Sequence, residues 1–352
     1  MKKKLIIAII ALFMFTTFGA CEKEGVVTQS DNSLEEVKEA NNEETVKDSG
    51  EQEPTGEPQP TEELEPTAEP TVTGAPNIAP NSEDMDSDVI SEPILMPVPP
   101  LSYYISDNTI VEEPHSIQLN MKSSEPNDII DDEEWFIDND LSMNTFEVPD
   151  PLGYTDGNLP DEISKKWNDL VITKAFYDDS YIYCTYGNEF GEGYILDIYD
   201  VDSFKIEYSL DFTNYYYKSE YTEADYGSMY HKIEWATIKD NILYFAHGYN
   251  TYARETEYLN AYITAVDLAD WSILWSTDAL VCNSYNFLII DDVIISGYGF
   301  TEEPDFLYQV SINTGKVIDT IPLKTAPSYF IKKDNILFVR TYDTNYEFEM
   351  IQ

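Results

Sequence analysis

A polar turn recurs four times in the C-terminal half of the chain, and it constrains the fold more than any other feature of the sequence. The four copies are Asp178-Asp179-Ser180, Asp240-Asn241, Asp291-Asp292 and Asp334-Asn335. A run rich in apolar or aromatic residues precedes each copy, and a β-branched or aromatic run follows it. A polar pair between two such runs predicts a β-hairpin. The sequence therefore predicts an all-β fold built from repeated hairpins.

A second recurring motif follows the first three turns. It occupies residues 200–206, 267–273 and 311–317, and each copy again reads as strand, turn and strand. One repeat therefore holds four strands, and the repeats are spaced 61, 51 and 43 residues apart from turn to turn. Four strands per unit at such intervals are typical of β-propeller blades that carry loop insertions.

The second motif resembles the blade repeats of quinoprotein-like (PQQ-like) β-propellers. The resemblance is clearest where Ala265-Val266-Asp267-Leu268 is followed by Ile273-Leu274-Trp275, and the third copy carries the turn Thr314-Gly315-Lys316. It covers residues 170–352, about half of the chain, and implies about four or more antiparallel four-stranded blades. It implies fold rather than chemistry, because one propeller architecture serves many functions. An irregular β-sandwich is the alternative fold.

The fourth repeat ends before its last strand, which would leave a sheet edge open. We therefore expect residues 101–169 to close or cap the propeller-like domain of residues 170–352. The candidate closing strands are Ser116–Leu119 and Asn144–Val148, and a short helix is predicted over residues 160–168.

The N-terminus predicts export and lipidation. Three lysines precede an apolar run over residues 5–15, and Gly19-Ala20-Cys21 follows it. This arrangement is typical of a signal peptide, over residues 1–20, and resembles the lipobox of bacterial lipoproteins. We expect acyl chains on Cys21 to anchor the protein at the extracellular face of the cell membrane. An ordinary secretory signal is the alternative.

The sequence of residues 21–100 predicts a disordered tether. Residues 22–100 hold no Phe, Trp or Tyr, and their repeats of Glu, Pro and Thr resemble the linkers of Gram-positive surface lipoproteins. A segment with so little apolar content cannot offset the entropy lost on folding. Proline and like charges extend such a chain, so this segment is expected to act as a spacer.

Charge and motifs narrow the function. The 20 Lys and Arg residues stand against 67 Asp and Glu residues, and a net charge of −47 argues against nucleic acid as a partner. The three histidines have no metal-ligand spacing, and Cys184 and Cys282 are interpreted as buried thiols or a disulfide. No nucleophile elbow, P-loop or zinc-protease motif is present. We therefore predict no catalysis and no cofactor.

Two acidic clusters suggest calcium as a candidate ligand of the protein. Residues 131–134 and 138–140 offer carboxylate oxygens, but the Gly and the final Glu of an EF-hand loop are missing. Solvated surface is the favoured interpretation of these clusters.

The longest insertions define a candidate binding face. In a four-stranded antiparallel blade, the loops that leave the second and fourth strands emerge on the same side. Here these loops are rich in aromatic and acidic residues, among them Tyr342, Glu303 and Asp305. Tyrosine combines a flat apolar face with a polar tip and suits sugars or proteins, although many such rings pack on their own strands. The candidate ligand-binding residues are Tyr216, Tyr217, Tyr221, Tyr249, Tyr252, Tyr258, Tyr298 and Phe300.

Three hypotheses follow for the function. The first is a lipid-anchored extracellular module that binds a glycan or a protein through this face. The second is an envelope scaffold that uses open strand edges, motivated by the incomplete last blade. The third, which the sequence supports least, is an enzyme acting on wall polysaccharide through carboxylates of the same face.

Overall fold

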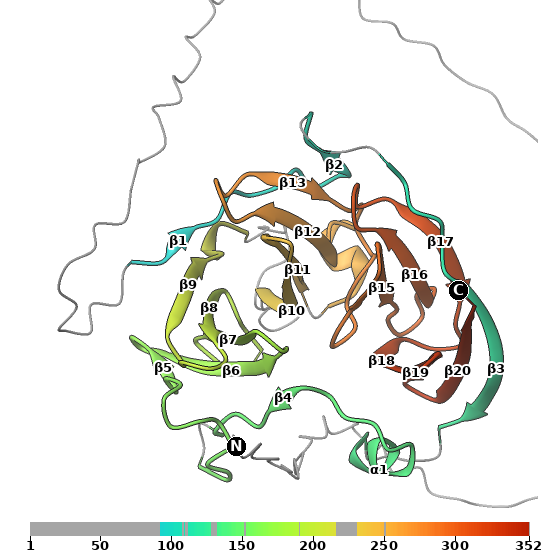
Figure 1. Ribbon diagram of the computed structural model, residues 1–352, viewed down its shortest axis with the longest axis horizontal. Coiled ribbons are helices and arrows are strands. Elements are labelled where there is room, and N and C mark those ends of the chain that lie inside the picture. The colour runs from blue at the N-terminus through green and yellow to red at the C-terminus, as the bar shows by residue number, and fades with distance from the viewer. Residues whose placement is uncertain are drawn as a thin grey trace, which may run out of the picture. The chain divides into compact units, whose positions relative to one another are not determined.

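Four antiparallel β-sheets follow one another around a common centre (Figure 1). The computed structural model describes residues 92–107, 109, 112–127, 132–150, 153–189, 191–215, 231–249 and 251–351. The signal peptide, Cys21 and nearly all of the predicted tether therefore lie outside the described residues. Four sheets in chain order, each with four main strands, are the blades of a β-propeller, as the repeats predicted.

The first two sheets come directly from the first two repeats. The first contains β6 (Leu170–Tyr177), β7 (Tyr181–Gly187), β8 (Ile195–Asp200) and β9 (Ile206–Asp211). The second contains β10 (His231–Lys239), β11 (Ile242–Tyr249), β12 (Tyr262–Asp267) and β13 (Ile273–Ser276). Two short 3-10 turns, η1 (Thr213–Tyr215) and η2 (Ala253–Thr256), lie in the loops.

The third and fourth sheets repeat the plan. The third contains β14 (Leu288–Ile290), β15 (Val293–Tyr298), β16 (Phe306–Ser311) and β17 (Val317–Pro322). The fourth contains β18 (Pro327–Lys333), β19 (Ile336–Thr341), β20 (Thr344–Ile351) and, from far earlier in the chain, β3 (Gln118–Pro126). Antiparallel pairing of β3 with β20 confirms that an earlier strand closes the last blade, with Leu119 opposite Met350.

The segment that leads into the blades adds short strands to the outer edges. β1 (Ile94–Leu95) pairs in parallel with β9, and β2 (Tyr104–Ile105) pairs antiparallel with β13. Together with β3, residues 92–126 thus cover the outermost strand of three of the four sheets (Figure 1). Such pairing removes edges that would otherwise be open to other chains.

Residues 132–167 fill the arc between the fourth and the first sheet (Figure 1). Helix α1 (Asp132–Asp138) packs on the fourth sheet, where the ring of Phe136 meets Tyr329 edge-on at 5.3 Å. β4 (Thr145–Phe146) and β5 (Lys166–Trp167) both pair with β6. The second candidate closing strand, Asn144–Val148, therefore pairs with the first sheet instead of the fourth. The helix predicted over residues 160–168 is wrong, because this stretch forms a turn and β5.

Apolar layers between successive sheets form the core. One cluster joins the first and second sheets, another the second and third, and another the third and fourth. A further cluster packs residues 146–167 against the free side of the first sheet. The polar turns sit at the hairpin ends, and Asp240, Asn241, Asp291 and Asp334 adopt positive φ there, which Asp and Asn tolerate. Within the described residues, no helix is long and apolar enough to cross a membrane.

Candidate functional site

The strand order places the connections that leave the second and fourth main strands on one side of the ring. The loops 188–194, 250–261, 299–305, 323–326 and 342–343 all leave a second or a fourth main strand. We call this side the loop face, and the opposite side, formed by the hairpin turns, the turn face. Antiparallel pairing in every blade forces this division, so the face predicted from the sequence exists.

The first strands of the blades meet at the centre of the ring. The ladders of β6, β10 and β18 each skip one residue near this point, at Thr173, Glu234 and Ser328. Such bulges turn side chains in new directions and occur often beside functional sites. The backbone N–H of Tyr285, just before β14, donates to the carbonyl of Ser328, which links the third sheet to the fourth.

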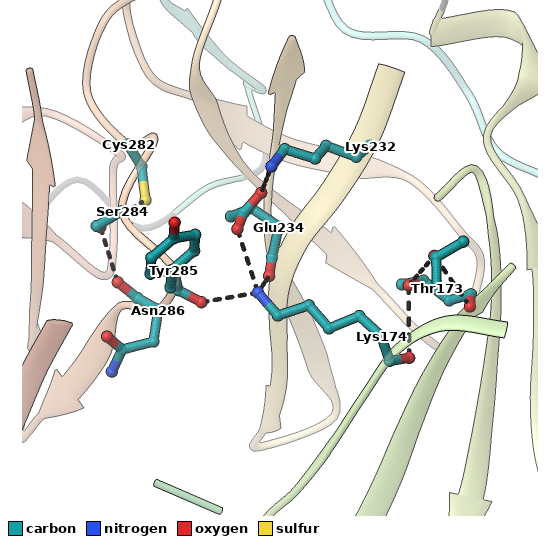
Figure 2. A network of polar contacts seen from close by, with 9 residues as sticks. Thr173, Lys174, Lys232, Glu234, Cys282, Ser284, Tyr285 and Asn286 are labelled. Atoms are coloured by element: carbon teal, nitrogen blue, oxygen red, sulfur yellow. Dashed lines mark hydrogen bonds and ion pairs between the residues drawn. The ribbon is translucent and has the colours of Figure 1, made fainter. Parts of the chain in front are cut away.

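Two lysines share one buried carboxylate at this centre (Figure 2). Lys232 Nζ lies 2.6 Å from Glu234 Oε2, and Lys174 Nζ lies 3.2 Å from Oε1. Lys174 also donates to the carbonyls of Glu234 and Tyr285, at 2.6 and 3.0 Å. Burial alone would raise the pKa of Glu234, but the two ammonium groups outweigh it and lower the pKa to about 2. The carboxylate therefore stays ionised and holds both lysines.

A groove of about 670 Å³ runs outward from this centre across the loop face, between the third and fourth sheets. Lys232 and Tyr285 form its inner end, and loops 299–305, 323–326 and 342–343 form its sides. The volume lies in the range of roughly 300–1,000 Å³ typical of ligand sites. It is lined by aromatic rings, carboxylates, two lysines, and the hydroxyl and amide groups of Asn283, Thr301, Thr325 and Ser328.

Asp305 is a carboxyl group in this lining whose Oδ1 is shielded from solvent and has no hydrogen-bond partner among the described residues. Burial, followed by the charges of Asp343 and Glu303, raises its pKa to about 6. Gly299 makes room for it, since a Cβ there would lie 2.1 Å from Asp305 Oδ1. The site thus contains a carboxyl group that titrates close to neutral pH.

The other carboxyl groups near Asp305 are already engaged. Glu303 accepts hydrogen bonds from the hydroxyl of Tyr298, at 2.5 Å, and from the backbone N–H of Ala253, at 2.8 Å. It thereby ties the second sheet's loop to the third sheet. Asp343 Oδ1 accepts from the hydroxyls of Thr325 and Thr344, at 2.7 and 2.8 Å, and these bonds lower its pKa.

The outer end of the groove carries an exposed ring. Tyr342, in the turn between β19 and β20, is 83% exposed and stands next to Asp343. Reasoning from the sequence placed Tyr342 on this rim but did not single it out as a ligand-binding residue. Lys232 and Lys324, the two bases of the lining, were missed, although bases are scarce in this chain.

The structure separates the predicted aromatic residues into groups. Phe300 lines the groove, and its ring contacts Tyr252 edge-on at 4.7 Å. Tyr258 is 63% exposed on the loop face but does not line the groove. Tyr249 and Tyr298 are buried, with their hydroxyls bonded to the Tyr215 carbonyl and to Glu303, so the expectation that these two rings face solvent is wrong. Tyr216, Tyr217 and Tyr221 lie outside the described residues.

Several other residues considered in the sequence are either paired with a base or buried in the core. In the acidic clusters that were weighed for calcium, Asp132 pairs with Arg340 and Asp140 with Lys333. No group of three metal-binding side chains occurs within the described residues. His231 and His247 lie near each other in the core, with ring centroids 6.3 Å apart, and burial lowers the pKa of both. Cys184 and Cys282 are both buried and free.

A larger hollow of about 1,040 Å³ opens on the turn face. It is lined by the hairpin turns at Asp291 and Asp334 and by residues 114–117. Its lining includes His115 but no Phe, Trp or Tyr, and none of Lys174, Lys232 and Glu234 belongs to it. The groove on the loop face is therefore the better candidate site.

Strand pairing defines the class of protein as a β-propeller, and comparisons add distant structural matches. No protein-family profile and no curated protein matches the sequence. The computationally designed Ika4 protein matches at a TM-score of 0.32 and 12% identity, over 55% of this chain and 100% of that one. BamB from Moraxella catarrhalis matches at 0.29 and 11%, over 50% and 58%, and Sqt1 from Saccharomyces cerevisiae at 0.31 and 15%, over 49% and 42%. This chain thus spans less than two thirds of the last two proteins, and likenesses at these TM-scores carry no argument about function.

Proposed function

We propose that the protein is a binding module of the cell surface that holds a glycan in the groove of its loop face. The observation that carries the proposal is the groove itself, with the exposed ring of Tyr342 at its outer end. A flat ring offers an apolar surface to a sugar, and carboxylates accept hydrogen bonds from sugar hydroxyls. Thr301 and Ser328 add neutral hydroxyl groups to the lining, which support a glycan over a protein ligand, whereas the Asn283 amide and the Thr325 hydroxyl are already hydrogen-bonded within the protein.

Membrane anchoring through Cys21 is part of the proposal. Its support is the order of charged, apolar and small residues before Cys21, followed by an extended tether. Kinship with PQQ-like propellers, suggested by residues 265–275, also belongs to the proposal. The scaffold hypothesis loses its motivation, because β3 covers the edge of β20 that had been expected to be open.

Removal of the Tyr342 ring is expected to weaken glycan binding about tenfold, because one stacked ring contributes roughly 1–1.5 kcal/mol. The measurement is the affinity of the full chain, made soluble by Cys21→Ser, for solubilised cell-wall glycans, with and without Tyr342→Ala. The thermal unfolding midpoint should stay unchanged, since this side chain is 83% exposed.

Tyr258→Ala is the matched control, because Tyr258 is exposed on the same face outside the groove. It is expected to bind like the parent. Weaker binding by Tyr258→Ala together with unchanged binding by Tyr342→Ala would move the site away from the groove. Shortened glycan products in the same assay would favour the enzyme hypothesis instead.

Replacing Cys21 is expected to release the protein from membranes. The parent, expressed with its own signal peptide in a Gram-positive host, should sediment with the membrane fraction and carry a diacylglyceryl group on Cys21. Cys21→Ser should appear in the medium, because the acyl chains provide the anchor. Mass spectrometry of the mature N-terminus is the measurement. A mature parent that begins at another residue would support the ordinary secretory signal.

A further inference from the structure

The charge on the groove lining is unbalanced. Its acidic residues are Glu302, Glu303, Asp305 and Asp343, and its basic residues are Lys232 and Lys324. Lys232 pairs at 2.6 Å with Glu234, a carboxylate behind the groove that Lys232 shares with Lys174, so the four acidic groups of the lining still outnumber the positive charge at its inner end. Lys324 Nζ lies 3.2 Å from the Ser124 hydroxyl, at the side formed by the fourth sheet. The charge that faces a ligand is therefore mainly negative, and it favours a cation.

Asp305 is the carboxyl group best placed to meet that cation. Glu303 and Asp343 each accept two hydrogen bonds from protein groups. Asp305 Oδ1, by contrast, receives none from any described residue, and because Oδ1 is shielded beside Gly299, a ligand would meet this carboxylate through Oδ2. A carboxylate that is partly removed from water and poorly hydrogen-bonded is costly, and an ammonium ion from a ligand would offset that cost.

We infer that the glycan held in the groove carries an amino sugar, with its ammonium group paired to the Asp305 carboxylate and its ring against Tyr342. This inference rests on the proposed function and names the ligand class for the same groove. The acidic lining would repel an anionic sugar. A neutral sugar would leave the negative charge of the lining uncompensated. An amino sugar fits all of these groups: its pyranose ring can pack on Tyr342, its hydroxyls can bond the polar groups of the lining, and its ammonium group can pair with a carboxylate.

Binding is expected to depend on pH in a defined direction. The charged or titratable groups around Asp305 are Asp343, Glu303, Glu302, Lys232, Lys324 and Tyr298. Only the ionised carboxylate pairs with ammonium, and in the free protein the pKa of Asp305 is raised to about 6. Affinity should therefore rise between pH 5 and 7 and fall again at higher pH, where the ligand amine loses its proton. Binding below pH 6 should release protons, because the bound cation lowers the pKa of Asp305.

The test is calorimetric titration of the full chain carrying Cys21→Ser, with glucosamine oligomers, the same oligomers fully N-acetylated, and a lysine-rich peptide. The expected result is that the amino oligomers bind at least about tenfold more tightly than the acetylated ones. Asp305→Asn should remove that preference and the rise in affinity between pH 5 and 7. The control Asp202→Asn removes one negative charge from an exposed turn far from the groove and should change neither.

The outcomes separate this inference from the proposed function. Equal binding of amino and acetylated oligomers, or an unchanged preference in Asp305→Asn, overturns the amino-sugar inference and leaves a glycan groove. Binding of the lysine-rich peptide alone overturns both, and makes the groove a site for cationic protein segments. Loss of binding to all probes in Asp305→Asn together with a lower unfolding midpoint reports misfolding, and Asp305→Glu, which restores the charge, must then recover the preference for the inference to stand.

Discussion

Replacing Arg340 by methionine is expected to lower the free energy of unfolding by about 3–5 kcal/mol, the range typical of removing one partner of a buried ion pair. Arg340 is 2% exposed, pairs with Asp132 at the start of α1, and donates to Asn127 at 2.9 Å. Its guanidinium also lies 5.4 Å from the centre of the Trp135 ring. The Arg340 side chain thus connects β19 to α1 and to the residue that follows β3. Its loss leaves Asp132 without its cation. Urea unfolding followed by tryptophan fluorescence measures the change.

Lys333→Met is the matched control for Arg340. Lys333 lies on the neighbouring strand of the same sheet and pairs with Asp140 just after α1, but the Asp140 side chain is 96% exposed. Exposed pairs contribute little, so this variant should unfold at nearly the same urea concentration as the parent. A similar loss in both variants would mean that burial of the Arg340 pair does not set its contribution.

Adding one methyl group at Gly315 is expected to cost about 2–5 kcal/mol. Gly315 has φ +72°, a left-handed conformation that costs other residues roughly 1–2 kcal/mol. A Cβ there would also lie 2.4 Å from Cε3 of Trp275, and overpacking of this kind adds about 1–3 kcal/mol. Trp275 cannot move aside easily, because it is 1% exposed and its indole N–H donates to the Ile312 carbonyl at 2.9 Å. Gly315→Ala should show this loss in urea unfolding.

Gly153→Ala separates the two contributions. Gly153 has φ +79°, but no atom lies within 4 Å of the position that a Cβ would take. Its alanine variant should therefore lose only the conformational part, about 1–2 kcal/mol. Equal losses at the two glycines would show that contact with Trp275 is not important.

The fold could be predicted from local sequence patterns, because a β-hairpin depends mainly on residues that are neighbours in the sequence. The turn at Asp240-Asn241 can be recognised in a dozen residues, since both residues tolerate positive φ and apolar runs flank them. The helix predicted over residues 160–168 was wrong, because the end of this stretch pairs with β6, with Trp167 opposite Leu170. The identity of the closing strand depended on pairing between distant segments, so two candidates had to be kept.

The site was predictable only in outline. The strand order expected from the sequence places Tyr342, Glu303 and Asp305 on one face, as the structure does. The burial of Tyr298 could not be foreseen, because it depends on a hydrogen bond to Glu303 across a loop. Nor could the special status of Asp305, which arises from close packing against Gly299 and from neighbouring carboxylates of two sheets.

The pairing of β3 with β20 has a consequence for synthesis. β3 is made before the main strands of the first three blades, yet its partner β20 follows all of them, so β3 must wait until every blade has been made. The groove lies between the two blades that are completed last. A chain that lacked β20 would therefore contain the first blades but no groove, and the ligand binding that we propose would require a closed ring.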